Sequence, residues 1–527
     1  MNQLIDQGIN SLGDFIEQSL SQYADHEAYS CLGQTLTFAQ IDEKSRALAC
    51  WLQQLSGLQP GDRIVIQLPN IIQYPVAAYA ALRAGLVLVN TNPMYTPQEM
   101  AHQFKDSGAK AIITLKDLLP KLNAVKAATD IETVLVCNPT DFISNDNTAS
   151  KDCINLNQAI ADGSILTLQA RKNNQLDDTC VLQYTGGTTG VSKGAELTHA
   201  NILSNAAQTK DRRSEKAVNG KDIIICPLPL YHIYAFNVNM VSFFSSGNLN
   251  ILIPNPADLS GFVASIKPFK FTGFAGINTL FVGLCMNDEF KQLDFSSLKF
   301  TFAGGAALTS DAVTAWKTVT GGTITEGYGL SETAPVLCAN KPGHEELGTV
   351  GAPLKGTEIQ IWNDKNQPVA PGEEGEIVAK GPQVMKGYWG RPADTQKSIV
   401  NGFFKTGDVG KMLDNGFIKI VDRLKDMIIV SGFNVYPNEV EDVLTRHPNI
   451  SEAAVISQQD AKTGESVCAY IVVNQQIETD EIISHCREYL TRYKVPKKIV
   501  FMESLPKSTV GKILRKDLRK VPVAQAC

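Results

Sequence analysis

The chain reads YTGGTTGVSKGA at residues 184–195, directly after the apolar run CVLQ at residues 180–183. Glycines let a backbone curl so that successive N–H groups point at one anion, and the hydroxyl side chains add further donors. Lys193 adds a positive charge. The run is too dense in Gly and Thr for a simple flexible turn, and it predicts a phosphate-binding loop after a strand. It is not a Walker A loop, because Lys193 is followed by Gly194 and no glycine directly precedes it.

The segments before this loop alternate between strand and helix patterns. Short β-branched runs stand at residues 63–68, 87–90, 111–114 and 133–136, with helical patterns at residues 75–84 and 96–106. This alternation predicts an α/β fold with a parallel sheet covered on both faces. Such folds bind ligands in loops at the carboxyl ends of strands, which is where the glycine-threonine run stands.

The pattern changes near residue 357. Strand patterns separated by turn residues stand at residues 358–362, 375–379 and 416–421, and they predict a smaller β-rich unit. We expect a large N-terminal domain over residues 1–421 (parallel-sheet subdomains plus the β-rich part at about 357–421), a hinge at 422–426, and a small mobile α+β domain at 427–527. A chain of 527 residues is too long for one core.

Composition excludes several classes of protein. The apolar fraction of 43% and the charged fraction of 19% are ordinary for a globular chain, and a net charge of -6 gives no reason to expect nucleic-acid binding. Eleven cysteines without a CxxC pair predict reduced thiols, not disulfides or a zinc site. We expect no signal peptide and no spanning helix, and a cytoplasmic location.

Further motifs follow in an order that resembles the adenylate-forming, or acyl-activating, superfamily of acyl-CoA synthetases, luciferases and nonribosomal adenylation domains. After the phosphate loop come AGGAA at 303–307, TEGYGLSET at 325–333, FKTGD at 404–408, DRLKD at 422–426 and PKSTVGKILR at 506–515. Each run alone would be an ordinary turn or solvated loop. Their shared order over almost the whole chain carries the resemblance.

The resemblance implies roles for these residues. Tyr328 would stack on adenine, Asp408 would hold the ribose hydroxyls, and Thr185 and Glu332 would bind Mg²⁺. The residues implied in catalysis are Lys512, Glu332 and Thr188, with Lys512 offsetting negative charge in the transition state. Those implied in binding ATP are Thr185, Gly186, Gly187, Thr188, Thr189, Gly190, Lys193, Gly304, Gly305, Ala306, Glu326, Gly327, Tyr328, Gly329, Ser331, Asp408, Arg423, Lys425 and Lys512.

Other stretches resemble bacterial long-chain fatty acyl-CoA synthetases. They are VNTNPMYTPQE at 89–99, LPLYHIYAF at 228–236, GINTLF at 276–281, NGFFKTGD at 401–408 and VSGFNVYPNEVE at 430–441. Substrate and CoA contacts are thereby implied for His232, Gly276, Ser431, Gly432, Phe433 and Asn434. For His232 a satisfied core histidine stays a nearly equal alternative. Ile429 departs from the lysine of some relatives, which leaves a nucleotide contact there open.

The implied reaction has two steps: a fatty acid and ATP give an acyl-adenylate, and coenzyme A then takes the acyl group. In the family the small domain turns at the position of Lys425 between the steps, so that Lys512 serves the first and residues 431–434 the second. The alternatives are a fatty acyl-AMP ligase that passes its product to a carrier protein, and a medium-chain acyl-CoA synthetase. Monomer or homodimer, peripheral membrane contact and regulation stay open.

Overall fold

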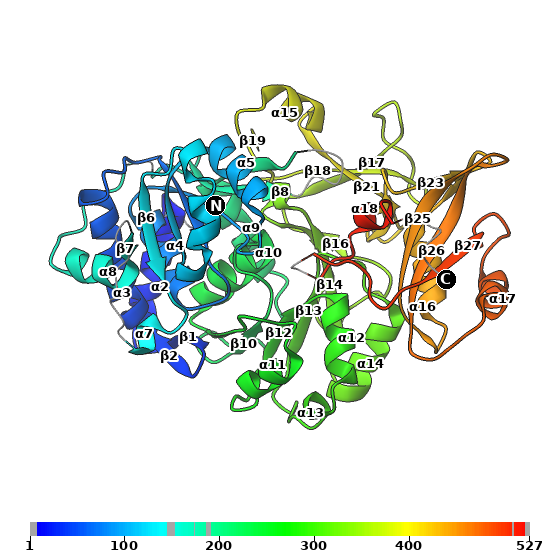
Figure 1. Ribbon diagram of the computed structural model, residues 1–527, viewed down its shortest axis with the longest axis horizontal. Helices are drawn as coiled ribbons and strands as arrows, with labels where there is room; N and C mark the ends of the chain where they lie inside the picture. The colour runs from blue at the N-terminus through cyan, green and yellow to red at the C-terminus, as the bar shows by residue number, and fades with distance from the viewer. Residues whose placement is uncertain (1–7, 145–152, 173, 186–190, 509–510, 522–527) are drawn as a thin grey trace.

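The computed structural model describes residues 8–144, 153–172, 174–185, 191–508 and 511–521 (Figure 1). Its first sheet has eight strands in the order β19-β9-β8-β4-β3-β5-β6-β7. The pairs from β8 to β7 are parallel, and β9 and β19 add an antiparallel edge. These strands are β3 (Arg63–Gln67), β4 (Val87–Asn90), β5 (Ala109–Leu115), β6 (Thr133–Cys137), β7 (Ile154–Asn155), β8 (Thr179–Thr185), β9 (Lys193–Thr198) and β19 (Gly387–Tyr388).

A second sheet of nine strands lies beside the first, in the order β16-β15-β14-β13-β12-β10-β11-β1-β2 (Figure 1). Its central strands, from β1 to β14, are parallel, and both edges are antiparallel. The strands are β1 (Glu27–Cys31), β2 (Gln34–Thr37), β10 (Ile223–Cys226), β11 (Leu249–Leu252), β12 (Gly273–Gly276), β13 (Phe300–Ala303), β14 (Ile324–Gly329), β15 (Val336–Ala339) and β16 (Ala352–Pro353). The predicted α/β fold with parallel sheets is confirmed.

The helices show why the local patterns predicted them well. Helix α5 (Pro97–Ser107) begins after the N-cap Thr96, whose side chain forms a capping box with Glu99, and it ends at Gly108 in the left-handed region at φ 59°. Helix α4 (Gln73–Arg83) is buried on every side, as expected for a helix apolar all round. It packs on α3 (Phe38–Gln54), which also contacts α2 (Leu12–Gln22) and α8 (Leu156–Ser164).

The predicted β-rich unit is a five-stranded antiparallel sheet. Its strands are β17 (Glu358–Trp362), β18 (Gly375–Lys380), β20 (Ile399–Val400), β21 (Phe403–Met412) and β22 (Ile418–Arg423). Strand β22 pairs Arg423 with Asp408 of β21. Two of the residues expected in the hinge, Asp422 and Arg423, therefore belong to this sheet.

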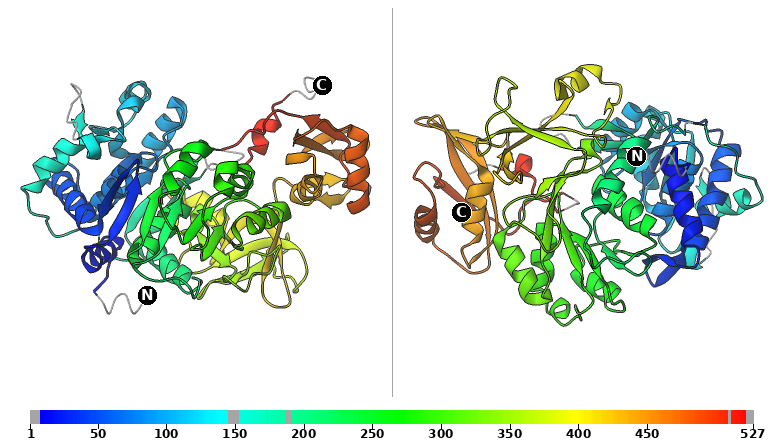
Figure 2. Two further views of the ribbon diagram at one scale, coloured as in Figure 1. Left: turned by 90° about the horizontal axis from the view of Figure 1, so that it is seen from below. Right: turned by 180° about the vertical axis from the view of Figure 1, so that it is seen from behind.

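The C-terminal domain has a sheet and cores of its own. Its strands are β23 (Ile428–Val430), β24 (Phe433–Val435), β25 (Ile450–Asp460), β26 (Gly464–Val473) and β27 (Lys498–Phe501), with helices α16 (Pro437–Thr445) and α17 (Thr479–Tyr489). After β27 the chain extends to the N-terminal domain, where Gly511 contacts Thr279, and returns to pack on β25 of the C-terminal domain with α18 (Arg515–Leu518) (Figure 2). None of the helices in the described ranges has the length and apolar character needed to cross a membrane.

Candidate functional site

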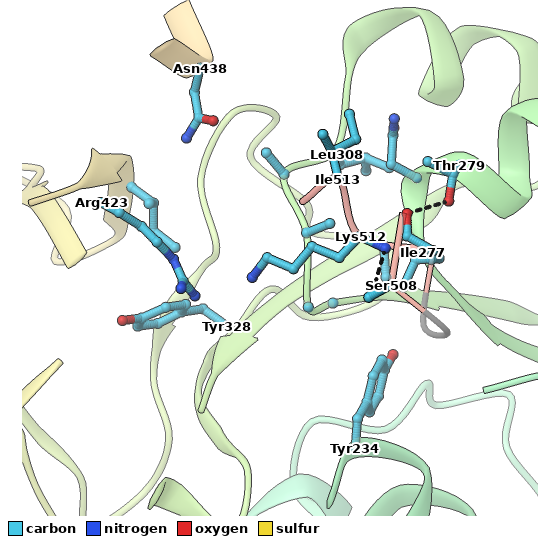
Figure 3. A pocket seen from close by; sticks show the side chains of 18 of the residues that line it. Tyr234, Ile277, Thr279, Leu308, Tyr328, Arg423, Asn438, Ser508, Lys512 and Ile513 are labelled. Carbon is cyan, nitrogen blue, oxygen red and sulfur yellow. Dashed lines mark hydrogen bonds between the residues drawn. The ribbon is translucent and has the colours of Figure 1, made fainter. Parts of the chain in front are cut away.

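A cleft of about 2470 Å³ lies between the N-terminal sheets and the C-terminal domain (Figure 3). Strand ends of both large sheets, the β-rich sheet and the last segment of the chain all reach it. Many of the predicted site residues line it together, namely Thr185, Lys193, His232, Gly304, Gly305, Ala306, Glu326, Gly327, Tyr328, Gly329, Ser331, Glu332, Asp408, Arg423, Lys425 and Lys512. Residues far apart in the sequence thus meet at one place.

The predicted phosphate loop joins the ends of β8 and β9. Its base is closed by the Ser192 hydroxyl, which donates to the carbonyl of Thr185 at 2.6 Å. The loop residues Gly186, Gly187, Thr188, Thr189 and Gly190 lie outside the described residues, so their assigned roles stay predictions.

Lys193 differs from the expectation of a cation free for phosphate. Its Nζ lies 3.0 Å from Oδ1 of Asp394 and 5.2 Å from the centre of the Tyr388 ring. Asp394 belongs to helix α15 (Pro392–Ser398), which follows β19. The charge of Lys193 is therefore already paired at the rim of the cleft, because β19 brings α15 beside β9.

The Gly-rich strand ends leave open backbone beside the cleft. A Cβ on Gly304 would come within 3.3 Å of the Tyr234 ring, and Gly305 has φ +82°, where a side chain is strained. At the end of β14 a Cβ on Gly329 would lie 1.9 Å from the Pro335 carbonyl oxygen. Glycine at these places is required by packing and backbone conformation, whatever the ligand.

A polar cluster stands where β14 meets the β-rich sheet. The Tyr328 hydroxyl donates to Oδ2 of Asp408 at 2.6 Å, and Nε of Arg423 lies 3.3 Å from Oδ1 of the same carboxylate. Asp408 is only 5% exposed. The cluster offers an aromatic face, a carboxylate and a guanidinium side by side, which is a donor set suited to a nucleotide.

Glu332 is a buried carboxylate, 9% exposed, just after β14. Its Oε1 accepts a hydrogen bond from the Tyr388 hydroxyl at 2.9 Å. Burial, the largest cause, raises the pKa of Glu332, and that bond opposes the shift. The described residues contain no group of three metal-binding side chains. One carboxylate with the Thr185 hydroxyl nevertheless fits Mg²⁺, which takes few protein ligands beside substrate phosphates and water.

Two further titratable groups respond to burial in this cleft. Burial raises the pKa of Glu326 from its ordinary value of 4.5 to about 8, so its carboxyl is largely protonated at neutral pH. Burial lowers the pKa of His232 to about 4, with a smaller contribution from Lys512. The Nδ1 of His232 accepts from the backbone N–H of Tyr234. His232 is therefore a neutral capping residue at the cleft wall and a poor base.

Lys512 reaches the centre of the cleft from the far end of the chain (Figure 3). The Thr279 hydroxyl donates to the carbonyl of Gly511 at 3.2 Å, and the backbone N–H of Lys512 donates to Ser508 Oγ at 3.1 Å. Burial lowers the pKa of Lys512 to about 8, and the positive charge of Arg423 adds to this effect. The negative charge of an anion bound here would oppose both effects on the pKa of Lys512.

The remaining predicted residues lie elsewhere. Ser431, Gly432, Phe433 and Asn434 are exposed, outside the lining of this cleft. Gly276 is buried behind the wall, where a Cβ would lie 2.9 Å from the Phe281 ring, so packing accounts for this glycine without a substrate contact. Lys425 lines the cleft beside Arg423, and burial lowers its pKa to about 8. Tyr388 was not predicted from the sequence, since only the pairing of β19 with β9 brings it to Glu332.

Comparison with known proteins places this cleft in context. Residues 16–389 match the family model described as AMP-binding enzyme, and residues 439–512 match AMP-binding enzyme C-terminal domain. A long-chain-fatty-acid–CoA ligase of Salmonella typhimurium is 43% identical, over 97% of this chain and 94% of that protein. The protein of that name from Bacillus subtilis is 37% identical, over 96% and 94%.

Solved structures share the whole fold. ATP-bound MatB from Rhodopseudomonas palustris has a TM-score of 0.84 at 28% identity, covering 96% of this chain and 98% of that one. The anthranilate CoA ligase AuaEII in complex with anthranoyl-AMP has a TM-score of 0.90 at 24% identity, covering 97% of both chains. The expected arrangement, parallel-sheet subdomains followed by a small C-terminal domain, is the one these proteins adopt.

Proposed function

Because the chain belongs to the family of AMP-binding enzymes, we propose that it joins a long-chain fatty acid to coenzyme A in two steps driven by ATP. The shared name of its full-length relatives supports this substrate class. One observation carries the proposal: Lys512, from the far end of the chain, lies in the same cleft as Glu332, Asp408 and Arg423. That set combines cations for phosphate with a buried carboxylate for a metal ion.

In the first step a carboxylate oxygen of the fatty acid attacks the α-phosphorus of ATP. The new P–O bond forms as the bond to the β-phosphate oxygen breaks, which gives acyl-AMP and pyrophosphate. Negative charge spreads over the phosphoryl oxygens, and preorganised cations lower the barrier. Lys512 and Arg423 supply that charge, while Asp408 accepts hydrogen bonds from the ribose hydroxyls. No covalent nucleophile of the protein is needed.

Glu332 and Thr185 would hold Mg²⁺ beside the triphosphate. When bound, the ion would neutralise part of the negative charge of the triphosphate. The chain contributes a carboxylate that burial keeps out of water and that lies in a short 3-10 helix, Ser331–Thr333, just after β14. Its orientation is fixed by packing, so the donor does not have to be ordered when ATP arrives.

In the second step the sulfur of coenzyme A attacks the acyl carbonyl carbon. The C–O bond to AMP breaks, AMP leaves with the bonding electrons, and the thiol proton passes to solvent. His232 is too weak a base to take that proton at neutral pH. We place residues 431–434 at the thiol in a second orientation of the C-terminal domain, reached by rotation at Lys425. Gly432, at φ +85°, suits a site of close approach.

The test is pyrophosphate release from ATP and palmitate, measured with and without coenzyme A. We expect one burst without coenzyme A and steady turnover with it. The variant Lys512→Ala should lose acyl-AMP formation by at least about 100-fold but still make the thioester from supplied acyl-AMP. No pyrophosphate with fatty acids from medium to long chain would refute the function. Equal loss of both steps in Lys512→Ala would refute the division of labour.

A further inference from the structure

The Tyr388 hydroxyl is the side-chain donor that holds the carboxylate of Glu332. It donates to Oε1 at 2.9 Å. Within the described residues no lysine or arginine forms an ion pair with Glu332. The bond therefore occupies one carboxylate oxygen of Glu332 without neutralising its charge. A tyrosine in this role keeps the full negative charge available for a cation.

Tyr388 is itself fixed to β9, the strand that follows the predicted phosphate loop. It lies in β19, opposite Ala195 of β9, and the next residue, Trp389, donates its N–H to the carbonyl of Gly194 at 2.9 Å. The backbone N–H of Tyr388 donates to the Thr395 hydroxyl at 2.9 Å. Strand β9 leads out of the predicted phosphate loop. The position of the Tyr388 ring is thus tied to the same strand that sets the loop.

The ring of Tyr388 is also held from its face. Nζ of Lys193 lies 5.2 Å from the ring centre, and Asp394 pairs with that cation at 3.0 Å. A cation over an aromatic face is attractive. The charge of Lys193 is therefore paired with Asp394 and also lies over the Tyr388 ring, which orients Glu332. This explains why a lysine beside a phosphate loop is found paired and not pointing freely into the cleft.

We propose that Tyr388 is a positioning residue that aims the Glu332 carboxylate at the magnesium–triphosphate complex and couples it to the phosphate loop through β9. The inference rests on the proposed function, because it presumes a metal nucleotide in this cleft. Partners that orient metal-binding side chains typically change metal affinity or activity 10–100-fold when removed. Loss of the Tyr388 hydroxyl should therefore change the dependence of the reaction on Mg²⁺ and leave the binding of fatty acid and coenzyme A unchanged.

The test compares Tyr388→Phe, which removes only the hydroxyl, with the wild-type enzyme. We expect the Mg²⁺ concentration for half-maximal pyrophosphate release to rise about 10-fold, with KM for palmitate unchanged. Calorimetry gives a readout apart from activity. ATP binding in EDTA should be unchanged, while the gain in ATP affinity on adding Mg²⁺ should shrink by a similar factor. A matched control is Tyr29→Phe, which loses a buried hydrogen bond to Tyr79, since neither tyrosine lines the cleft.

A double-mutant cycle separates positioning from general damage. In the Glu332→Gln background, Tyr388→Phe should cause no further change in Mg²⁺ dependence, because the carboxylate it orients is gone. Equal weakening of ATP binding with and without Mg²⁺, or an unchanged Mg²⁺ dependence, would overturn the proposal. So would an equal effect of Tyr388→Phe in both backgrounds. A wild-type enzyme that never forms acyl-AMP would instead refute the proposed function itself.

Discussion

Lys512 carries a charge that the folded protein opposes until a nucleotide arrives. Its pKa is lowered to about 8 by burial and by Arg423. A bound triphosphate would raise that pKa again, so ATP binding near pH 8 should take up a proton. We expect calorimetry in buffers of different ionisation enthalpy to show this uptake near pH 8 and to show its loss well below pH 7, where the amine is already charged.

The matched variant for this measurement is Lys512→Met, which keeps the length of the side chain without the amine. It should abolish most of the uptake while the protein stays folded. The ratio kcat/KM for ATP in the wild type should accordingly fall as pH rises above about 8, because its pH dependence reports the pKa values of groups in the free enzyme. Proton uptake that persists in Lys512→Met would assign the effect to another group, with Lys425 the first candidate.

Glu326 gives a second prediction at the scale of one residue. Its pKa is raised to about 8 by burial, above the ordinary 4.5, so the folded state binds more protons than the unfolded state between these values. Stability from this group is present below about pH 4.5 and is lost as pH rises through about 8. Glu326→Gln mimics the protonated acid and should keep adenylation within about threefold at pH 7.

The measurement is the thermal midpoint of wild type and Glu326→Gln at acidic and alkaline pH. The two proteins should differ little at pH 5, and the variant should be the more stable at pH 8.5. If Glu326→Gln instead becomes less stable than wild type as pH rises, the pKa of Glu326 is not raised. Glu326 would then be charged in the folded protein.

Within the site, the pairing between side chains is the feature that the sequence predicts least well. The motifs that supply the predicted site residues are local, and many of those residues line the cleft. The pairing of Lys193 with Asp394 and of Tyr388 with Glu332 was not, because each pair forms only after β19 joins the edge of the first sheet. No spacing in the sequence encodes that contact.

At the scale of elements, Gly329 shows why one turn needs glycine. Strands β14 and β15 pair antiparallel with a register shift at Tyr328 and Gly329. A Cβ on Gly329 would lie 1.9 Å from the Pro335 carbonyl oxygen. Gly329→Ala should therefore destabilise the protein by at least about 2 kcal/mol. It should also slow adenylation, since Ser331 and Glu332 follow directly.

The control is Gly283→Ala in α12 (Asn278–Met286), where the nearest atom to an added Cβ is 3.6 Å away. That change should raise stability by up to about 1 kcal/mol, because alanine favours helix. Urea unfolding and pyrophosphate release, measured on both variants, test whether glycine is required at position 329. Equal urea midpoints for the two variants would show that the β14–β15 turn can accommodate the added methyl group.

The elements that the sequence predicted well are those with local causes. The predicted start of α5 at Thr96 is confirmed by its capping box, and the strand runs from 63 to 136 became β3 to β6 within a residue or two. The π-helix η3 (Phe236–Phe243) was not predicted. Its sequence FNVNMVSF is buried at nearly every position, with Asn237, Asn239 and Ser242 between apolar side chains, so periodicity could not separate it from a strand or an ordinary helix.

At the scale of the whole molecule, one arginine ties the tail to the hinge region. Arg515 lies 2.7 Å from Glu441 and 3.4 Å from Asp426, and it approaches Asp422 at 3.6 Å. The Asp422 carboxylate also accepts the backbone N–H of Asn438 at 2.8 Å. These contacts join β22 to the C-terminal domain and to the segment that carries Lys512. Domain placement could not be predicted from the sequence, because it depends on such long-range pairs.

The hydrogen bond between Tyr436 and Glu374 also bridges the two domains, outside this cluster, and it provides a test of domain rotation. The Tyr436 hydroxyl of the C-terminal domain donates to Oε2 of Glu374, just before β18, at 2.8 Å. The structure has this bond in the orientation that places Lys512 in the cleft, and we expect rotation of the C-terminal domain to break it. A hydrogen bond to a charged group contributes about 1.5–3 kcal/mol. Tyr436→Phe should thus shift the population away from this orientation by about 10-fold or somewhat more.

The two half-reactions report that shift in opposite directions. Adenylation, measured as pyrophosphate release, should slow by up to about 10-fold in Tyr436→Phe, because Lys512 is withdrawn more of the time. Thioester formation from supplied acyl-AMP should be unchanged or faster, because the second orientation gains population. Glu374→Gln, which keeps an acceptor but removes the charge, should give a weaker effect in the same direction. If Tyr436→Phe slows both half-reactions equally, the bond contributes to folding alone. It would then have no effect on the balance between two domain orientations.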